Sequence, residues 1–368
     1  MSEIDVAGSW PQVISQLLAG KDLSASHAGA AMRSVLSGEA TPSQITAFIV
    51  ALRAKGETEL ELEGMLAEVR RAAERVFLSD EISQRALDIV GTGGDHSHSV
   101  NVSTMAGLVV AGAKIPVCKH GSRASSSKSG AADVLEALGV AIELDGVGVA
   151  KCVEETGFGF CFAQRFHPAF RFTGPSRREI GVPTVFNLLG PMANPAQISY
   201  MVVGVGDPVA ASVMAKAITT RGVKRAWVVH GHGSMDELSL SGPCPVVEVN
   251  LGKTREFEIN ATSLGLAHAD VAAVRGGSPK DNAKIFRDLL DGEKGPVRNI
   301  VALNAAAGIV VAGKADDNPK SYEVALGVAL VDQSPYPPPL ATIIMVESMM
   351  STIAALLWNN NMNGLDVM

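Results

Sequence analysis

Hydrophobic and polar positions divide the chain into a first part with helical periodicity and a longer second part with a different pattern. Over residues 10–76, apolar side chains recur three and four positions apart, as in Ile45, Phe48 and Ile49. Thr41 and Thr58 each begin a sequence typical of a capping box, in which two side chains cap a helix start reciprocally. The pattern predicts a small all-α region that serves packing or dimerisation.

From Ala86 onward, short apolar runs alternate with helical patterns, which is typical of a parallel α/β sheet. The runs at 86–90, 115–118, 158–162, 200–205 and 226–229 predict strands, and 245–249 with 255–259 predicts a hairpin. Helices are predicted over 101–113, 129–138, 278–290 and 301–312, and 170–190 is also helical in pattern. The helices at 278–290 and 301–312 and the hairpin are expected to be scaffold. The predicted fold class is α/β with a small N-terminal all-α domain.

The first two predicted strands each end in a loop that is suited to holding an anion, and a helix is predicted after each loop. The loops are Gly91-Thr92-Gly93-Gly94-Asp95 and Lys119-His120-Gly121-Ser122-Arg123-Ala124-Ser125-Ser126-Ser127. A helix start offers unpaired N–H groups and the positive end of the helix dipole, and glycines let the backbone approach a ligand. Further donors are Thr92, Ser103, Thr104, Ser126, Ser127, Lys119 and Arg123. Two such loops predict a ligand with two separate phosphate groups, although neither contains a Walker A or dinucleotide-binding sequence.

Composition narrows the class of protein. A chain of 368 residues, 47% of them hydrophobic, is long enough for two domains with buried cores. The net charge of −7 argues against a nucleic-acid-binding groove. Cys118, Cys152, Cys161 and Cys244 form no C-x-x-C pair, which argues against a zinc site and a disulfide framework. The acidic start of the chain has no apolar signal core, so a cytoplasmic protein is predicted.

Asp236 and Glu237 form an acidic pair shortly after the strand predicted at 226–229. Neighbouring carboxylates at the carboxyl end of a sheet strand suit a hard cation such as Mg²⁺, which bridges to a substrate phosphate. An acidic pair taken alone is usually a solvated helix start. Two phosphate-binding loops in the same predicted sheet favour the metal site instead.

Two histidine pairs, His96 with His98 and His230 with His232, invite comparison with a zinc site. Each pair lacks further cysteine or histidine ligands nearby, which argues against zinc. His96 and His98 are expected in a loop over the phosphates, and His120 is expected to orient its neighbours by packing. No histidine is predicted to act as a general base.

Five motifs occur in one order along the chain. They are Gly91-Thr92-Gly93-Gly94-Asp95, Asn101-Val102-Ser103-Thr104, Lys119-His120-Gly121 with Ser126-Ser127, Asn187-Leu188-Leu189-Gly190-Pro191 with Asn194-Pro195, and Asp236-Glu237. In order and approximate spacing, over about 24–317, they resemble the anthranilate phosphoribosyltransferases. The resemblance implies a nucleoside phosphorylase/phosphoribosyltransferase-like architecture with the active site in the interdomain cleft. Its domains would be a helical domain over 1–82 joined by 168–190, an α/β catalytic domain over 83–317, and a tail over 318–368.

The resemblance also implies a reaction and its site residues. Enzymes of this family displace pyrophosphate from C1 of phosphoribosyl pyrophosphate (PRPP) with the amine of anthranilate, in tryptophan biosynthesis, and act with Mg²⁺ as homodimers. The residues implied in PRPP binding are Gly91, Gly94, Asp95, Ser99, Asn101, Val102, Ser103, Thr104, Lys119, His120, Gly121, Ser122, Arg123, Ala124, Ser125, Ser126, Ser127 and Ala131. Those implied in anthranilate binding are Gly91, Ser122 and Arg177, and those implied in metal binding are Ser103, Asp236 and Glu237.

Two positions need separate comment. Arg177 and Arg178 are adjacent in a predicted helix, where neighbours point about 100° apart, so at most one faces the cleft. The family motif places Arg177 there, to pair with the carboxylate of anthranilate. Ser122 departs from the family, which usually has an asparagine that touches the acceptor at this point. Serine keeps a donor and an acceptor but lacks the reach of an amide.

Beyond Asp317 the resemblance ends. Residues 340–358 contain one charge, Glu347, and are long enough for a membrane span of about 20 residues. Glu347 and the hydroxyls of Ser348, Ser351 and Thr352 argue instead for a buried core or interface helix, so no membrane partner is predicted.

Two alternative functions stay open. A pyrimidine nucleoside phosphorylase of the same superfamily would use phosphate, and a non-catalytic phosphosugar-binding module would need no metal pair.

Overall fold

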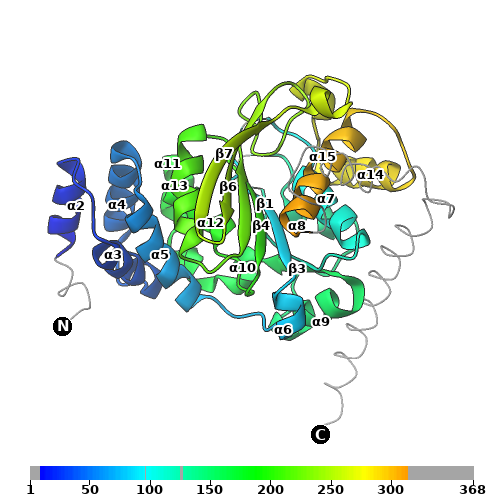
Figure 1. Ribbon diagram of the computed structural model, residues 1–368. Helices are drawn as coiled ribbons and strands as arrows, with labels where there is room; N and C mark the ends of the chain where they lie inside the picture. The colour runs from blue at the N-terminus through cyan, green and yellow to red at the C-terminus, as the bar shows by residue number, and fades with distance from the viewer. Residues whose placement is uncertain (1–8, 96, 125–126, 314–368) are drawn as a thin grey trace, which may run out of the picture.

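The computed structural model describes residues 9–95, 97–124 and 127–313 (Figure 1). Its first helices are α2 (Trp10–Leu18), α3 (Ala25–Ser37), α4 (Pro42–Lys55) and α5 (Glu59–Ala72). Thr41 and Thr58 cap α4 and α5 through capping boxes, each hydroxyl accepting from the backbone N–H three residues later. Figure 1 shows these helices together at one end of the molecule. The predicted helical region and its two capping boxes are confirmed.

The second part of the chain folds around a 7-stranded sheet with the order β3-β2-β1-β4-β5-β6-β7. The strands are β1 (Leu87–Gly91), β2 (Val117–Gly121), β3 (Phe158–Phe162), β4 (Tyr200–Gly204), β5 (Arg225–Val229), β6 (Cys244–Asn250) and β7 (Lys253–Ile259). Strands β1 to β5 are parallel, whereas β6 and β7 form the predicted hairpin and run antiparallel. The α/β fold class is confirmed, and the sheet is mixed rather than wholly parallel.

The predicted end of the second strand is wrong, because β2 continues through Lys119 and His120 to Gly121. Polar side chains at these positions suggested the start of a loop. Both are buried, however, and each has a protein partner: the Lys119 ammonium donates to the Ile89 carbonyl oxygen, and His120 Nδ1 lies 3.0 Å from the Gly190 carbonyl oxygen. A buried strand can carry polar residues when their hydrogen bonds are satisfied inside the protein.

Further helices and short 3₁₀ turns precede, connect and follow the strands. They are α6 (Asp80–Ser83), α7 (Val102–Gly112), α8 (Ala131–Ala137), α9 (Gly146–Thr156), α10 (Ala163–Phe166), α11 (Gly174–Ile180), α12 (Val185–Met192), α13 (Pro208–Thr219), α14 (Pro279–Leu290) and α15 (Pro296–Val311), with turns at Pro168–Phe172, Ala261–Leu264 and Val271–Val274. The helix predicted to begin at residue 301 begins earlier, at Pro296, because proline fits the first turn of a helix. The other predicted helices agree closely with α7, α8 and α14, whereas the stretch 170–190 contains the end of a 3₁₀ turn, α11 and most of α12, with a break after Gly181.

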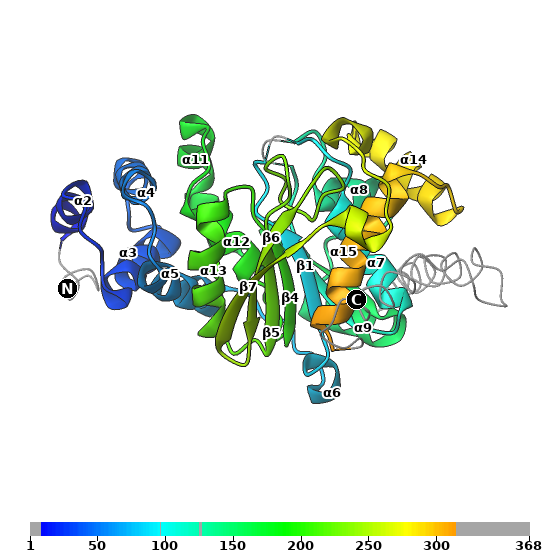
Figure 2. The ribbon, with the colours of Figure 1, turned by 45° about the horizontal axis from the view of Figure 1, so that its top comes forward.

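Both faces of the sheet are buried, each by its own hydrophobic core. Along β4, Met201 and Val203 belong to one core and Val202 to the other, as the alternation of a strand requires. One core contains residues of α12, α13 and the amino-terminal helices, and the other contains residues of α7 and α15. Figure 2 shows α12 and α13 on one side of the sheet and α7 and α15 on the other.

Helices α11 and α12 pack against the amino-terminal helices, although they are distant in sequence. α11 contacts α4, and α12 contacts α4 and α5. Phe186 of α12 shares a hydrophobic core with Phe48 of α4 and Leu66 of α5.

The domain boundaries taken from the sequence stay a prediction. Within the described part of the chain, no helix is long and apolar enough to cross a membrane. The apolar segment 340–358 lies outside the described residues.

Glu248 on β6 is 2% exposed and holds a cluster of buried donors together. Its carboxylate accepts from Arg225 Nε at 2.7 Å and Trp227 Nε1 at 2.9 Å, and it also pairs with Arg255. Glu248→Ala would leave the Arg225 guanidinium buried without its carboxylate, so the free energy of unfolding should fall by about 3 kcal/mol. Urea unfolding measures this loss. Glu256→Ala, at an exposed position of β7, should change it by less than about 0.5 kcal/mol, and equal effects would contradict the prediction.

Candidate active site

The predicted site residues meet in a cleft at the carboxyl ends of the parallel strands, where β1 lies between β2 and β4. In an open α/β sheet, ligands bind where the strand order reverses in this way. The predicted residues that line the cleft are Gly91, Gly94, Asp95, Ser99, Asn101, Ser103, Thr104, Lys119, His120, Gly121, Ser122, Arg123, Ala124, Ser127, Ala131, Arg177, Asp236 and Glu237. Val102 is fully buried at the start of α7 and does not line the cleft. Ser125 and Ser126 lie outside the described residues.

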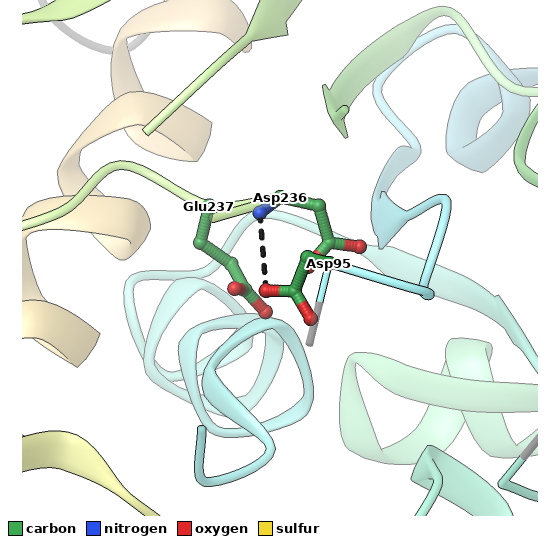
Figure 3. Close-up of side chains that lie close together, drawn as sticks. All are labelled: Asp95, Asp236 and Glu237. Carbon is green, nitrogen blue, oxygen red and sulfur yellow. Dashed lines mark hydrogen bonds between the residues drawn. The ribbon is translucent and has the colours of Figure 1, made fainter. Parts of the chain in front are cut away.

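Three carboxylates lie together in this cleft (Figure 3). Asp95, Asp236 and Glu237 each offer an oxygen, and these oxygens all lie within 4.8 Å of one another. The backbone N–H of Asp236 donates to Asp95 Oδ2 at 3.4 Å, which is the dashed line in Figure 3. Asp95 follows β1, whereas the acidic pair follows β5. Sequence analysis did not predict Asp95 as a metal ligand, because only the fold brings together two segments that are 141 residues apart.

Three glycines let the acidic pair approach the strand ends closely. A methyl group on Gly91 would lie 2.2 Å from Asp236 Oδ2, and one on Gly204 would lie 1.5 Å from the Asp236 carbonyl oxygen. A methyl group on Gly231 would lie 2.0 Å from the Glu237 carbonyl oxygen. Any side chain at these positions would therefore push the acidic pair out of place. For Gly91, predicted as a ligand contact, this adds a reason why glycine occurs at the end of β1.

The carboxylates repel one another in a buried setting. Burial, followed by the charge of Asp95, raises the pKa of Asp236 to about 7. Burial and the charge of Asp236 raise the pKa of Glu237 well above its ordinary value. Glu237 Oε2 is buried and has no hydrogen-bond partner among the described residues. A set of hard oxygen donors whose negative charge Lys119 balances only in part fits a divalent cation such as Mg²⁺.

Lys119 supplies buried positive charge beside the first loop. It is 1% exposed, and its ammonium donates to the Ile89 carbonyl oxygen and to Ser103 Oγ, the latter at 3.2 Å. Burial lowers the pKa of Lys119 to about 8, and three nearby carboxylates, led by Asp88, oppose this lowering. The Lys119 ammonium therefore lies at the cleft and is also hydrogen-bonded to protein groups. Ser103, the third predicted metal ligand, is held by this same contact.

Arg123 and the start of α8 make internal contacts. The Arg123 guanidinium contacts Asp133 Oδ1 at 3.0 Å and Glu136 Oε2 at 2.8 Å. Asp133 Oδ2 also accepts from the backbone N–H groups of Ala124 and Gly130, at 2.8 and 2.9 Å. The amide of Gly130, the N-cap residue of α8, thus donates to an aspartate of that helix. That Arg123 and the second loop hold a phosphate stays a prediction, and a phosphate would have to compete with these internal bonds.

Asp88, fully buried on β1, ties three motif segments together. Its carboxylate accepts from the His120 backbone N–H at 3.1 Å and from Asn194 Nδ2 at 2.8 Å. Asn194 Nδ2 also donates to the Cys118 carbonyl oxygen at 2.7 Å. Burial lowers the pKa of His120 well below its ordinary value, so its imidazole is neutral at neutral pH. Sequence analysis missed the role of Asp88, because it stands inside an apolar strand whose partners are far away in sequence.

Among the described residues, no histidine belongs to the group of three carboxylates. His98 lines the cleft with a φ of 50°, and its Nδ1 is buried without a partner among the described residues. His96 lies outside the described residues. His230 Nδ1 lies 2.8 Å from the Val205 carbonyl oxygen, and His232 Nδ1 lies 3.2 Å from a serine hydroxyl.

Arg177 lines the cleft from α11, whereas Arg178 is exposed, as the geometry of adjacent helical residues predicts. The Arg177 guanidinium carbon lies 5.2 Å from the centroid of the Phe186 ring, and burial lowers the pKa of Arg177. Among the described residues, no carboxylate forms an ion pair with Arg177. A partly buried guanidinium that stacks on a ring without an acidic partner suits the carboxylate of a ligand. Ser122 also lines the cleft, and its hydroxyl donates to the Arg123 carbonyl oxygen at 2.9 Å.

The raised pKa of Asp236 predicts that a divalent cation at these carboxylates would bind in a pH-dependent way. Below its value of about 7, a proton competes with the cation for the carboxylate. Mg²⁺ should therefore raise the unfolding temperature more at about pH 8 than at about pH 6. Without a cation, stability should fall as the pH rises from about 4 to about 7, because the folded state keeps a proton that the unfolded state loses. Scanning calorimetry measures both effects, and equal gains from Mg²⁺ at the two pH values would contradict the prediction.

Comparison with known proteins finds relatives of both parts of the chain. Residues 83–331 match the family described as "Glycosyl transferase family, a/b domain", and residues 11–73 match "Glycosyl transferase family, helical bundle domain". The anthranilate phosphoribosyltransferase of Roseiflexus castenholzii is 49% identical over 306 residues, which cover 83% of this chain and 89% of the relative. That of Saccharopolyspora erythraea is 50% identical over 304 residues, which cover 83% and 85%.

Solved structures give the same picture. The anthranilate phosphoribosyltransferase from Thermus thermophilus is 39% identical, with a TM-score of 0.83 over 93% of this chain and 99% of that one. The anthranilate phosphoribosyltransferase from Saccharomyces cerevisiae in complex with PRPP and Mg is 25% identical, with a TM-score of 0.83 over 94% and 98%. The similarity therefore includes both the helical part and the sheet.

Proposed function

The chain belongs to the anthranilate phosphoribosyltransferase family, and on this premise we propose that it transfers the phosphoribosyl group of PRPP to the amine of anthranilate. The products are N-(5-phosphoribosyl)anthranilate and pyrophosphate, a step of tryptophan biosynthesis. The observation that carries the proposal is the meeting of Asp95, Asp236 and Glu237 with both loops in one cleft. A cation held by the carboxylates can reach a diphosphate held by the loops.

In the proposed reaction, the protein positions the substrates and neutralises the leaving group. Asp236 and Glu237 would hold Mg²⁺, with Asp95 beside them and Ser103 as a further ligand. When bound, the cation offsets the negative charge that develops on pyrophosphate as it leaves. The glycines of the first loop and the Thr104 hydroxyl hold PRPP.

Arg177, Ser122 and Gly91 are proposed to hold anthranilate, with the guanidinium of Arg177 on its carboxylate. The neutral aromatic amine attacks C1, so that the N–C1 bond forms while the bond from C1 to the pyrophosphate oxygen breaks. The amine proton then leaves to solvent. A neutral arylamine is nucleophilic as it stands, so the reaction needs no strong base. The His120 imidazole is neutral because burial lowers its pKa.

The test is a product assay with PRPP, Mg²⁺ and anthranilate. We expect phosphoribosylanthranilate to form only when all three are present, which the change in anthranilate fluorescence follows. Phosphorolysis of a pyrimidine nucleoside, without any product from anthranilate, would establish the nucleoside phosphorylase alternative. Binding of PRPP without turnover of any arylamine would establish a non-catalytic phosphosugar-binding module.

We also propose a homodimer that forms through the amino-terminal helices. Leu18, Val50 and Leu60 expose 74%, 44% and 51% of their surface on α2, α4 and α5. Exposed apolar side chains on neighbouring helices support a contact between two copies. Sedimentation at micromolar concentration should give twice the chain mass, and Leu60→Asp should shift it toward the monomer. Val147→Asp, at a position 78% exposed on α9, should not, and a monomeric wild type would contradict the proposal.

We further propose a cytoplasmic location. The four cysteines are free and buried, and the thiols of Cys118 and Cys161 form a hydrogen bond of 3.5 Å rather than a disulfide. Free thiols this close to each other support a reducing compartment. Cell fractionation should recover the protein with cytoplasmic marker enzymes, and recovery in a membrane or exported fraction would contradict the location.

A further inference from the structure

Asn282, near the start of α14, is 1% exposed, and both ends of its amide are bonded. Its Oδ1 accepts from the Gly277 N–H at 2.7 Å, and its Nδ2 donates to Asn101 Oδ1 at 2.9 Å. Asn101 is the N-cap residue of α7, 181 residues earlier in the chain, and it ends the connection from β1 to α7 that contains the first loop. The contact therefore joins a helix that the sequence analysis regarded as scaffold to a phosphate-binding loop.

Asn101 extends this connection to the second loop. Its Nδ2 donates to the Ser129 carbonyl oxygen at 3.1 Å, and the Ser129 hydroxyl donates to Asn101 Oδ1 at 3.5 Å. Ser129 directly precedes Gly130, the N-cap residue of α8. Both lone pairs of Asn101 Oδ1 are thus engaged by protein donors. One chain of hydrogen bonds runs from α14, through the connection that contains the first loop, to the connection that contains the second.

The backbone supports the same contact. Residues 98–100 and 274–276 form an antiparallel bridge with backbone hydrogen bonds of 2.8 and 2.9 Å. A methyl group on Gly276 would lie 2.7 Å from Asn282 Oδ1 and 3.0 Å from the Ser99 carbonyl oxygen, so this close approach requires glycine. Helix α14 also packs against α8, which follows the second loop, and Figure 2 shows the two helices beside each other.

We infer that Asn282 is a positioning residue that sets the spacing of the two phosphate-binding loops through Asn101. The inference rests on the proposed function, because it takes the two loops to hold the two phosphate-bearing ends of PRPP. A ligand held at two points is sensitive to their separation, since a shift at one point misplaces the contact at the other. Asn282 is not among the described residues that line the cleft, so its effect on PRPP passes through Asn101.

The experiment compares Asn282→Asp and Asn282→Ala with Ser278→Ala, by calorimetric titration with PRPP and Mg²⁺ and by steady-state kinetics. Asn282→Asp keeps the shape and the acceptor for Gly277 but replaces the donor to Asn101 by an oxygen. Both Asn282 variants should raise the Kd and KM for PRPP about tenfold, and should change the KM for anthranilate less than about twofold. Ser278→Ala removes the cap that accepts from the Asp281 N–H, so it should lower the unfolding temperature without changing the Kd for PRPP.

A double-mutant cycle tests the route. If Asn282 acts through Asn101, Asn101→Ala/Asn282→Ala should bind PRPP as weakly as Asn101→Ala alone. Additive losses, or an unchanged Kd for PRPP in Asn282→Asp, would overturn the inference and leave the proposed function standing.

Amide hydrogen exchange gives a check that needs no substrate. Residues 98–101 and 129–130 should exchange faster in Asn282→Ala than in Ser278→Ala, because the first variant releases the loops and the second only weakens α14. Equal exchange in the two variants would overturn the inference. A wild-type protein that neither binds nor turns over PRPP would instead overturn the proposed function.

Discussion

Replacing Asp236 by asparagine and Glu237 by glutamine should abolish Mg²⁺-dependent turnover and should at the same time raise the unfolding temperature. Loss of a cation clamp on a leaving group costs several kcal/mol, so kcat/KM should fall by about a thousandfold or more. Stability should rise because neutral amides of the same shape remove the two causes that raise the pKa of both carboxyls, which are the burial of charge and then the mutual repulsion. A purely structural role for the pair predicts the opposite change in stability.

The control for this double variant is Glu256→Gln, at an exposed position of β7. It should leave both turnover and the unfolding temperature unchanged. Rates measured over a range of Mg²⁺ concentrations, in the absence of other divalent ions, give the comparison. Near-normal turnover of the double variant at low Mg²⁺ would exclude the metal site. A lower unfolding temperature would show that the two carboxylates stabilise the fold through contacts rather than strain it.

Features that depend on neighbours in sequence were predictable. Thr41 and Thr58 cap their helices through amides only three residues away, so the sequence pattern contains both partners. The hairpin of β6 and β7 follows from the short spacing of its strands, and the parallel direction of β1 to β5 follows from the alternation of strands with helices. The five motifs indicated the family, and the family motif selected Arg177 rather than Arg178 as the residue that faces the cleft. Helix geometry alone left that choice open.

Features that depend on partners far away in sequence were not predictable. Asp95 joins Asp236 across 141 residues, and Asn101 meets Asn282 across 181 residues, so no local pattern connects either pair. Lys119 on β2 was placed in a loop because a charged residue usually marks the surface. It is buried because Ile89, Ser103 and the surrounding carboxylates satisfy its charge, and these partners come from other elements. Polar residues at a functional site therefore break the simple rule that places polar residues outside.

Arg177→Ala should raise the KM for anthranilate by more than about tenfold, because it removes the cation proposed to pair with the carboxylate. A hydrogen-bonded charge pair contributes about 2 to 3 kcal/mol, which corresponds to a factor of about 30 to 150. The KM for PRPP should change little. Arg178→Ala is the matched control, since it removes the same charge from the exposed face of the same helix. Equal effects of the two variants on the KM for anthranilate would exclude the assignment.

Ser122→Asn should have a smaller effect, less than about tenfold on the KM for anthranilate. The Ser122 hydroxyl is shorter than the asparagine amide that is usual in the family. A contact to the anthranilate amine that is direct with asparagine is therefore bridged by water with serine, at a cost of about 1 kcal/mol or less. The Ser122 hydroxyl already donates to the Arg123 carbonyl oxygen at 2.9 Å, and asparagine would give that bond up. Ser122→Asn therefore gains a direct contact to the anthranilate amine and loses the hydrogen bond to the Arg123 carbonyl oxygen. The two changes in free energy are of similar size. If Ser122→Asn instead created anthranilate activity that the wild type lacks, the natural acceptor would be a different amine.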